Sequence, residues 1–145
     1  MTDNGKPAAI AEVETSIREL TSDNFSAAID DQSLAIVDFW APWCAPCRAF
    51  APVFAAAAAK HSDAFFAKVN TEEEQELAAQ FGIRSIPTLM IFRDNIIVFS
   101  EAGALGAGSL EQVLTAAKAL DMDAVRRSVE EQSAERESER ATPAR

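Results

Sequence analysis

The sequence predicts an α/β fold with a central mixed sheet flanked by helices. β-rich runs alternate with helical segments along most of the chain. Residues 34–40 (LAIVDFW) form a near-continuous apolar run, the pattern of a central strand buried on both faces. The runs at 88–92 and 96–100 are separated by only three residues, as in an antiparallel hairpin. Helical crossovers followed by this hairpin give the order βαβαβαββα, with five strands and four helices.

The first half of the chain supplies the first strands and helices of this order. Residues 14–20 alternate only in part and predict a weak edge strand. Residues 21–29 begin with Thr-Ser-Asp, which can cap the N-terminus of a short helix. Residues 44–61 form an alanine-rich helix. Pro52 lies inside this helix and should kink it, because its ring removes a backbone hydrogen bond.

The second half adds a strand, a short helix, the hairpin and a last helix. Residues 65–70 are β-rich, and residues 72–81 form a helix with acidic residues in its first turn, where the helix dipole favours them. Gly82 ends that helix. Asn95 in the hairpin turn is a candidate for the left-handed conformation. Ser109 is expected to cap the last helix, whose apolar face comprises Leu110, Val113, Leu114, Ala117 and Leu120.

The composition divides the 145-residue chain into one domain and two termini. The length fits a single domain, which we place at residues 13–120. Residues 1–12 are mostly small or polar and predict a flexible N-terminus. From Asp121 onward the chain has seven acidic and five basic residues and little that could form an apolar face. Residues 121–145 are therefore expected to be a charged, largely disordered tail.

Charge and cysteine content argue against several function classes. A net charge of −10 opposes binding to nucleic acid or to an anionic membrane surface. No run approaches the ~20 apolar residues of a membrane helix, and residues 1–14 lack the basic and apolar regions of a secretory signal. We therefore expect a cytoplasmic protein. In that reducing compartment, a close cysteine pair is more often catalytic or metal-binding than structural.

The two cysteines, Cys44 and Cys47, lie where the central strand gives way to a helix. The N-terminus of a helix presents unpaired N–H groups and a partial positive charge, which favour a thiolate over a thiol. Cys44 lies outermost and is expected to be the exposed nucleophile with a low pKa. Cys47 follows one turn later, near enough to form a disulfide, and Pro46 suits a first turn because its missing N–H costs nothing there. The motif therefore predicts a redox-active dithiol.

A metal site is the alternative use of such a cysteine pair. Zinc needs about four ligands, and beyond the two cysteines the chain offers one histidine, His61. Two chains that share a metal or cluster through their cysteine pairs remain an alternative. His61 lies near a helix end and is expected to be an ordinary surface residue, and we expect no metal.

Asp38 interrupts the apolar run six residues before Cys44. An unpaired buried carboxylate is costly, so burial should raise the pKa of Asp38. Groups with such shifted pKa values often act as acids or bases. The position of Asp38 behind the cysteine-bearing helix suggests proton transfer toward Cys47, directly or through water. The alternative is a carboxylate at the strand end that faces solvent.

These motifs and their order resemble the thioredoxin family over residues 15–120, and the resemblance implies the thioredoxin fold. Some stretches look closest to a bacterial subfamily that normally carries a zinc-binding cysteine cluster upstream. This sequence has no such cluster, so the metal is not carried over. The stretches that carry the resemblance are Val37-Asp38-Phe39-Trp40-Ala41, Trp43-Cys44, Pro46-Cys47, Pro52, Lys68-Val69-Asn70, Phe81-Gly82-Ile83-Arg84 and Ile86-Pro87-Thr88.

The resemblance also implies roles for individual residues. Cys44 would attack a substrate disulfide and Cys47 would resolve the product. Asp38 would be the buried carboxylate and Lys68 its neighbour. Pro87 would be the cis-proline that faces the disulfide. Gly103 would be the glycine that lets a substrate chain approach, and the alternative is a plain turn glycine. The expected substrate-binding residues are Trp43, Ala45, Pro46, Ile86, Pro87 and Gly103.

The favoured function is that of a protein-disulfide reductase, in which the Cys44–Cys47 dithiol passes electrons to a substrate disulfide. By resemblance, an NADPH-dependent flavin enzyme, a thioredoxin reductase, would recharge the pair. The chain would then need no cofactor of its own and would act as a monomer on disulfide-containing proteins. The alternatives are an oxidase or isomerase, which would want an export signal and a histidine between the cysteines, and a non-catalytic docking subunit or holdase. Ala45 stands where the family usually has glycine, which leaves the redox potential open.

Overall fold

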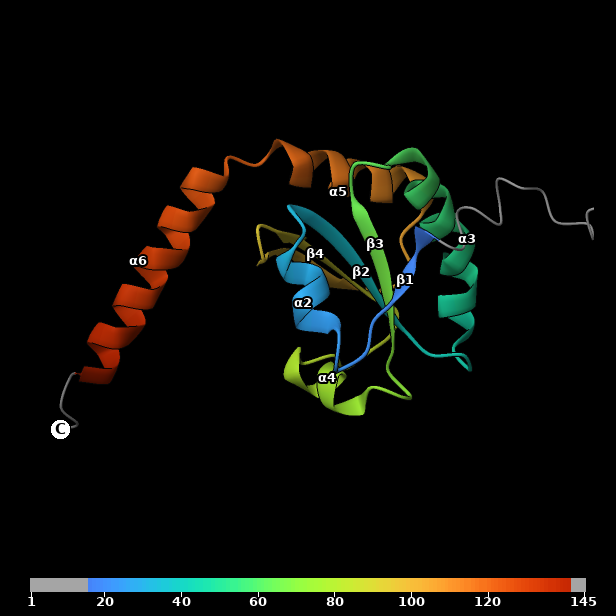
Figure 1. Cartoon of the computed structure of the whole chain (residues 1–145), viewed down its shortest axis with the longest axis horizontal. Coiled ribbons are helices and arrows are strands. Elements are labelled where there is room, and N and C mark those ends of the chain that lie inside the picture. The colour runs from blue at the N-terminus through green and yellow to red at the C-terminus, as the bar shows by residue number, and fades with distance from the viewer. Residues whose placement is uncertain (1–15, 142–145) are drawn as a thin grey trace, which may run out of the picture.

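A central five-stranded sheet with helices on both faces forms the core of the protein (Figure 1). The computed structural model describes residues 16–141. From the first strand to the helix at residues 107–119, the order is the predicted βαβαβαββα. The strands are β1 (Arg18–Glu19), β2 (Leu34–Trp40), β3 (Phe65–Asn70), β4 (Thr88–Arg93) and β5 (Ile96–Ala102), and the helices are α2 (Phe25–Asp30), α3 (Ala45–Lys60), α4 (Gln75–Gln80), α5 (Ala107–Ala119) and α6 (Met122–Ala141).

The strands lie in the order β1-β3-β2-β4-β5. β1 and β2 both run parallel to β3, while β4 runs antiparallel to β2 and to β5. The sheet is therefore mixed, as predicted, with β2 at its centre. Asp94 and Asn95 form the β4–β5 turn with φ of 50° and 67°. Both take the left-handed conformation that matches a tight turn to the twist of its strands, whereas the sequence pointed to Asn95 alone.

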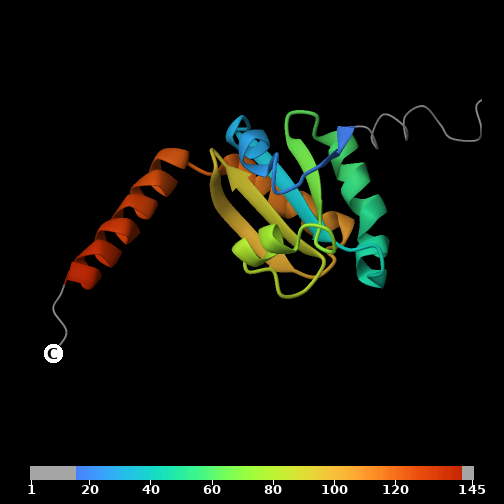
Figure 2. The same cartoon turned by 60° about the horizontal axis from the view of Figure 1, so that its bottom comes forward.

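The side chains of β2 divide the core into two halves. Leu34 and Ile36 pack with side chains of α3 and α5 on one face of the sheet. Val37 and Phe39 pack with side chains of α2 and α4 on the other face. Figure 2 shows α4 in front of the sheet and α5 behind it. Because side chains alternate along a strand, Asp38 points to the same face as Ile36, the face that α3 covers.

The short elements begin at other residues than the sequence predicts. The edge strand β1 has only two residues. Asn24, rather than one of residues 21–23, occupies the N-cap position of α2. Residues 71–73 form a turn, and the N–H of Glu74 donates to the carbonyl oxygen of Asn70 at 2.9 Å, so α4 starts only at Gln75.

The last helix of the domain, α5, begins at Ala107 with Gly106 at its N-cap, whereas the sequence pointed to Ser109. Gly106 has extended backbone (φ −74°, ψ 165°), and its carbonyl oxygen accepts the N–H of Leu110 at 3.0 Å. A backbone carbonyl from any residue can make this bond, and Gly106 makes no side-chain cap. The helix therefore extends one turn further upstream than the capping rule suggests.

The segment that was expected to be a largely disordered tail contains the helix α6. Its composition explains the difference, because alanine, glutamate and arginine are strong helix formers. Met122 is the buried residue of α6, and Arg126 binds the carboxylates of Asp94 and Asp123 at 3.0 and 2.6 Å. Beyond that first turn α6 extends away from the sheet in both views (Figures 1 and 2). No helix within residues 16–141 is long and apolar enough to cross a membrane.

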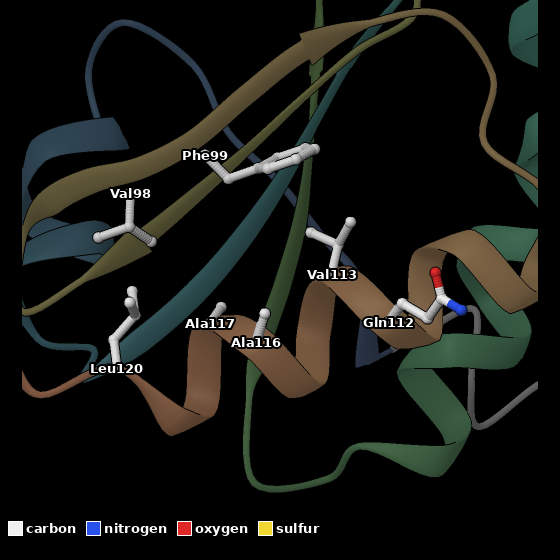
Figure 3. A pocket seen from close by; sticks show the side chains of 7 residues that line it. All are labelled: Val98, Phe99, Gln112, Val113, Ala116, Ala117 and Leu120. Atoms are coloured by element: carbon white, nitrogen blue, oxygen red, sulfur yellow. The ribbon is translucent and has the colours of Figure 1, made fainter.

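An apolar groove of about 290 Å³ lies between β5 and α5 (Figure 3). Val98 and Phe99 line it from β5. None of the site residues predicted from the sequence lines this groove, so it forms no part of the candidate site. Its other lining residues, Gln112, Val113, Ala116, Ala117 and Leu120, belong to α5 and to the residue that follows it.

Candidate active site

Cys44 and Cys47 lie at the junction of β2 and α3. Cys44 occupies the N-cap position of α3 with extended backbone (φ −86°, ψ 113°), and Cys47 lies in the first turn of the helix. Their Cα atoms are 5.2 Å apart and their Sγ atoms form a disulfide. Both cysteines are buried in a small cluster with Ala41, and Cys44 is only 4% exposed, so the expectation of an exposed Cys44 is wrong. The predicted dithiol is thus present in its oxidised form at a helix N-terminus.

The start of α3 favours negative charge on the sulfur of Cys44. The N–H of Cys47 donates to Cys44 Sγ at 3.2 Å. The first turn of α3 holds no acidic residue, and Arg48 lies within it, with its Nη1 donating to the carbonyl oxygen of Pro42 at 2.9 Å. Once the disulfide is reduced, this N–H and the positive end of the helix dipole would stabilise a Cys44 thiolate.

A loop that is distant in sequence lies against the disulfide. The carbonyl oxygen of Ile86 is 3.7 Å from Cys44 Sγ, and the Ile86–Pro87 peptide bond is cis, as the resemblance implies. The carbonyl oxygen of Pro87 accepts the N–H of Gly103 at 2.8 Å. Gly103 has a φ of 110°, a conformation that side-chain-bearing residues avoid. The fold therefore brings Cys44, Pro87 and Gly103 together, although they are far apart along the chain.

Trp43 is the large apolar side chain exposed beside the disulfide, with 65% of its surface accessible. Its Nε1–H donates to Glu72 Oε2 at 3.1 Å, which fixes the indole ring. Ile83, Arg84 and Ile86 join Trp43 in lining a hollow of about 320 Å³. Glu72 could not be recognised as a site residue from the sequence, because an acidic residue before a helix already has an ordinary explanation in the helix dipole.

The residues between the cysteines, Ala45 and Pro46, are exposed. They present a methyl group and an apolar ring, and neither adds a charge. Trp40 and Ile86 pack against the cluster that the cysteines form with Ala41. The surface around the disulfide is therefore largely apolar.

Asp38 is buried, with only 1% of its surface exposed. Neither of its carboxyl oxygens has a hydrogen-bond partner among residues 16–141. Desolvation raises the pKa of Asp38 to about 7, while the Lys68 ammonium lowers this pKa and the Glu19 carboxylate raises it further. The alternative of a solvent-facing carboxylate at the strand end is wrong. A carboxyl group that titrates near neutral pH, on the face covered by α3, can both accept and return a proton.

Lys68 lies opposite Asp38 on the neighbouring strand β3. Its Nζ is 5.0 Å from the centroid of the Trp40 ring, within cation–π distance. Glu19 on β1 lies opposite Lys68 on the other side, so the lysine stands between two carboxylates. Sequence reasoning missed Glu19. Its only signal would have been the strand register, which a two-residue edge strand does not reveal.

His61 is more enclosed than the ordinary surface residue that the sequence predicts, because its side chain is only 14% exposed. Its Nε2 lies 2.9 and 3.0 Å from the two carboxylate oxygens of Glu111, and Lys118 Nζ donates to its Nδ1 at 2.7 Å. An ammonium can only donate, so Nδ1 accepts and Nε2 carries the hydrogen toward Glu111. This cluster ties the end of α3 to α5. Within the described part of the chain, no three His, Cys, Asp or Glu side chains form a group that could hold a metal ion.

Comparisons with known proteins agree on one family. The Thioredoxin family model matches residues 16–116. A Streptomyces coelicolor protein assigned as a thioredoxin 2 is 49% identical over 121 residues, which cover 83% of this chain and 90% of that protein. Thioredoxin 1 of Synechococcus elongatus is 45% identical over 97 residues, which cover 66% of this chain and 91% of that protein.

A solved structure leads to the same family. The crystal structure of Fasciola hepatica thioredoxin matches with a TM-score of 0.64 and 32% sequence identity, over 68% of this chain and 97% of that one. The fold, the disulfide at the start of α3 and the sequence matches are mutually consistent. The chain therefore belongs to the thioredoxin family.

Proposed function

We propose that Cys44 attacks substrate disulfides and that Cys47 resolves the mixed disulfide that forms. The family and the Cys44–Cys47 disulfide identify the chain as a thiol–disulfide oxidoreductase. One observation carries this division of roles. The N–H of Cys47 donates to Cys44 Sγ at the N-cap of α3, and this donor stabilises charge on Cys44 rather than on Cys47. Cys44 is therefore the better thiolate and the better attacking group at neutral pH.

The reduction of a substrate then takes two exchange steps. The Cys44 thiolate attacks one sulfur of the substrate disulfide, a mixed disulfide forms, and the other substrate sulfur leaves as a thiolate that takes up a proton. Cys47 next loses its proton and attacks Cys44 Sγ, which releases the second substrate sulfur. Two electrons have passed to the substrate, and the Cys44–Cys47 disulfide closes as in this structure.

Asp38 is proposed as the group that takes the proton of Cys47 in the resolving step. It is buried behind the helix that carries the cysteines, and its pKa of about 7 lets it exchange a proton at the pH at which the reaction runs. Lys68, opposite Asp38 on β3, would stabilise the carboxylate once the proton has left.

The apolar surface around the disulfide is proposed as the docking site for protein substrates. Trp43 and Ile86 flank Cys44, and Ala45 and Pro46 cover the gap between the cysteines. An extended substrate chain could approach over Pro87 and Gly103. A Cβ atom built on Gly103 would meet no atom within 4 Å, so this side of the loop is open.

Each turnover leaves the cysteine pair oxidised, so another protein must supply two electrons. We propose that an NADPH-dependent flavin enzyme, a thioredoxin reductase, recharges the pair. Both exchange steps use sulfur chemistry alone, and the chain needs no cofactor of its own for them. We further propose that the protein acts as a monomer in the cytoplasm, in electron transport and cell redox homeostasis.

Trapping with cysteine variants tests the proposed roles. Cys47→Ser, mixed with insulin, should accumulate a mixed disulfide that shows as an added mass and disappears with dithiothreitol. Cys44→Ser is the matched control and should accumulate none. The unmodified chain should also accelerate the precipitation of insulin by dithiothreitol. Trapping by Cys44→Ser alone would reverse the roles, and a lack of acceleration would refute the reductase.

A further inference from the structure

Five residues lie in one row across the sheet. The strand register pairs Glu19 with Lys68, Lys68 with Asp38, Asp38 with Leu89, and Leu89 with Glu101. Directly paired residues of neighbouring strands point to the same face. Leu89 packs into the core half formed with α3 and α5, so the row faces the helix that carries the cysteines. Asp38 thus has a cation on one side and an apolar side chain on the other.

Lys68 is the cation that acts on Asp38, and it has a second neighbour. Neither carboxyl oxygen of Asp38 has a hydrogen-bond partner in the described chain, so the ionised form depends on Lys68 for stabilisation. Glu19 lies on the other side of the same lysine, at the exposed edge of the sheet. Burial raises the pKa of both carboxyl groups, Lys68 lowers both, and Glu19 raises the pKa of Asp38 further.

We propose that Glu19 is a positioning residue for the resolving step, an inference that rests on the proposed role of Asp38. The Glu19 carboxylate attracts the Lys68 ammonium electrostatically, which weakens the stabilisation that Lys68 gives to ionised Asp38. Glu19 also repels a negative charge on Asp38. Asp38 therefore takes the proton of the Cys47 thiol during resolution and can still return it when the disulfide is reduced. Without Glu19, the lysine would hold Asp38 as a carboxylate over a wider pH range.

The surroundings of Asp38 leave few other charges that could act in this way. β4 contributes the apolar Leu89, and the α3 side chains that pack on this face, Phe50 and Phe54 among them, are apolar. Glu101 ends the row on β5, exposed and beyond Leu89. Glu73 acts on Glu19, whose pKa it raises, and is not among the groups that shift Asp38.

A titration of Asp38 tests the electrostatic part without any activity assay. The side-chain carboxyl carbon of Asp38 would be followed by NMR in the oxidised full chain. Charges two strands apart are separated by about 10 Å, so the Glu19→Gln substitution should lower the midpoint by about 0.3 to 1.2 pH units. Glu19→Asp keeps the charge and should keep the midpoint.

Glu101→Gln is the matched control. It also removes one negative charge two strands away from Asp38, but the residue between Glu101 and Asp38 is Leu89, whereas the residue between Glu19 and Asp38 is Lys68. It should shift the midpoint by less than half as much as Glu19→Gln, because Glu101 is not among the groups that shift the pKa of Asp38. Equal shifts in the two variants, or no shift in Glu19→Gln, would overturn the inference and leave the proposed function of the cysteines and of Asp38 intact.

The kinetic part uses a mixed disulfide of Cys44 with thionitrobenzoate, which releases a coloured thiolate when Cys47 resolves it. In Glu19→Gln, the midpoint of the pH profile of this release should fall by the same amount as the NMR midpoint. The rate of attack by Cys44 on a small disulfide should not change. A shifted NMR midpoint with an unchanged release profile would overturn the role of Glu19 together with that of Asp38.

Discussion

Replacement of Asp38 by asparagine should remove a pH-dependent cost from the folded state. The pKa of Asp38 is 3.8 in its ordinary state and about 7 in the folded protein, because burial disfavours the charge. Between these values the folded chain holds a proton that the unfolded chain has lost. The stabilising contribution of protonated Asp38 is therefore complete below about pH 4 and is lost as the pH rises through 7. Asparagine cannot ionise and lacks this dependence.

The size of the effect follows from the pKa difference. Each unit corresponds to about 1.4 kcal/mol, so roughly three units give about 4 kcal/mol above pH 7. Asp38 is 1% exposed, so solvent screens this cost little. Relative to the unmodified protein, the free energy of unfolding of Asp38→Asn should rise by about 1.4 kcal/mol per pH unit from about pH 4 to pH 7 and then level off.

Urea unfolding of the oxidised proteins across this pH range provides the measurement. Other carboxylates contribute to both curves, so the quantity to plot is the difference between variant and unmodified protein at each pH. Asp30→Asn is a matched control, because it makes the same substitution at an exposed residue at the end of α2. A difference for Asp38→Asn that stays constant within about 1 kcal/mol from pH 5 to pH 8 would refute the assignment of a buried, proton-binding carboxyl group.

Three further predictions concern the cysteines, the tail and Ala45. Iodoacetamide should alkylate Cys44 before Cys47 in the reduced protein, since Cys44 Sγ accepts the N–H of Cys47, and faster labelling of Cys47 by mass spectrometry would reverse the assignment. Removal of residues 123–145 keeps the buried Met122 and should change neither the urea midpoint nor insulin reduction, whereas a loss of more than about 1 kcal/mol would show that α6 packs on the domain. Ala45→Gly should change the reduction potential by no more than a few tens of millivolts, because a methyl group adds no charge and no donor. Equilibration with glutathione measures this, and a potential of the unmodified protein above about −200 mV would favour an oxidase.

The fold and the redox centre could be predicted from the sequence because strong local patterns carry them. The run around Val37 and Phe39 is too apolar to lie at a surface, and this alone placed Asp38 in the interior. The spacing of Cys44 and Cys47 directly after such a strand favours the start of a helix, which is where the structure has them. In each case the determinants lie within about ten residues of one another, where the backbone geometry is nearly fixed by the residue pattern.

The partners of these residues could not be predicted, because they come from other parts of the chain. The local sequence around His61 is typical of a surface residue. In the fold, Glu111 and Lys118 of α5, at least 50 residues further along the chain, contact its ring and enclose it. Gly106 occupies the N-cap of α5 without a side-chain hydrogen bond, so the serine downstream gave a misleading signal. α6 was expected to be disordered because it lacks an apolar face, yet helix propensity alone can favour a helix without one.

The row from Glu19 to Asp38 links stability to reactivity in one set of side chains. An ionised Asp38 costs about 4 kcal/mol by the difference in pKa, a large part of the 5 to 15 kcal/mol by which a domain is stable. A buried apolar residue at this position would avoid that cost and would fit the surrounding core. Replacement of Asp38 by an uncharged residue should therefore stabilise the fold above neutral pH and slow the resolving step at once. A variant of Asp38 that gains stability at pH 8 but resolves mixed disulfides at the full rate would show that the carboxyl group is a burden without a catalytic use.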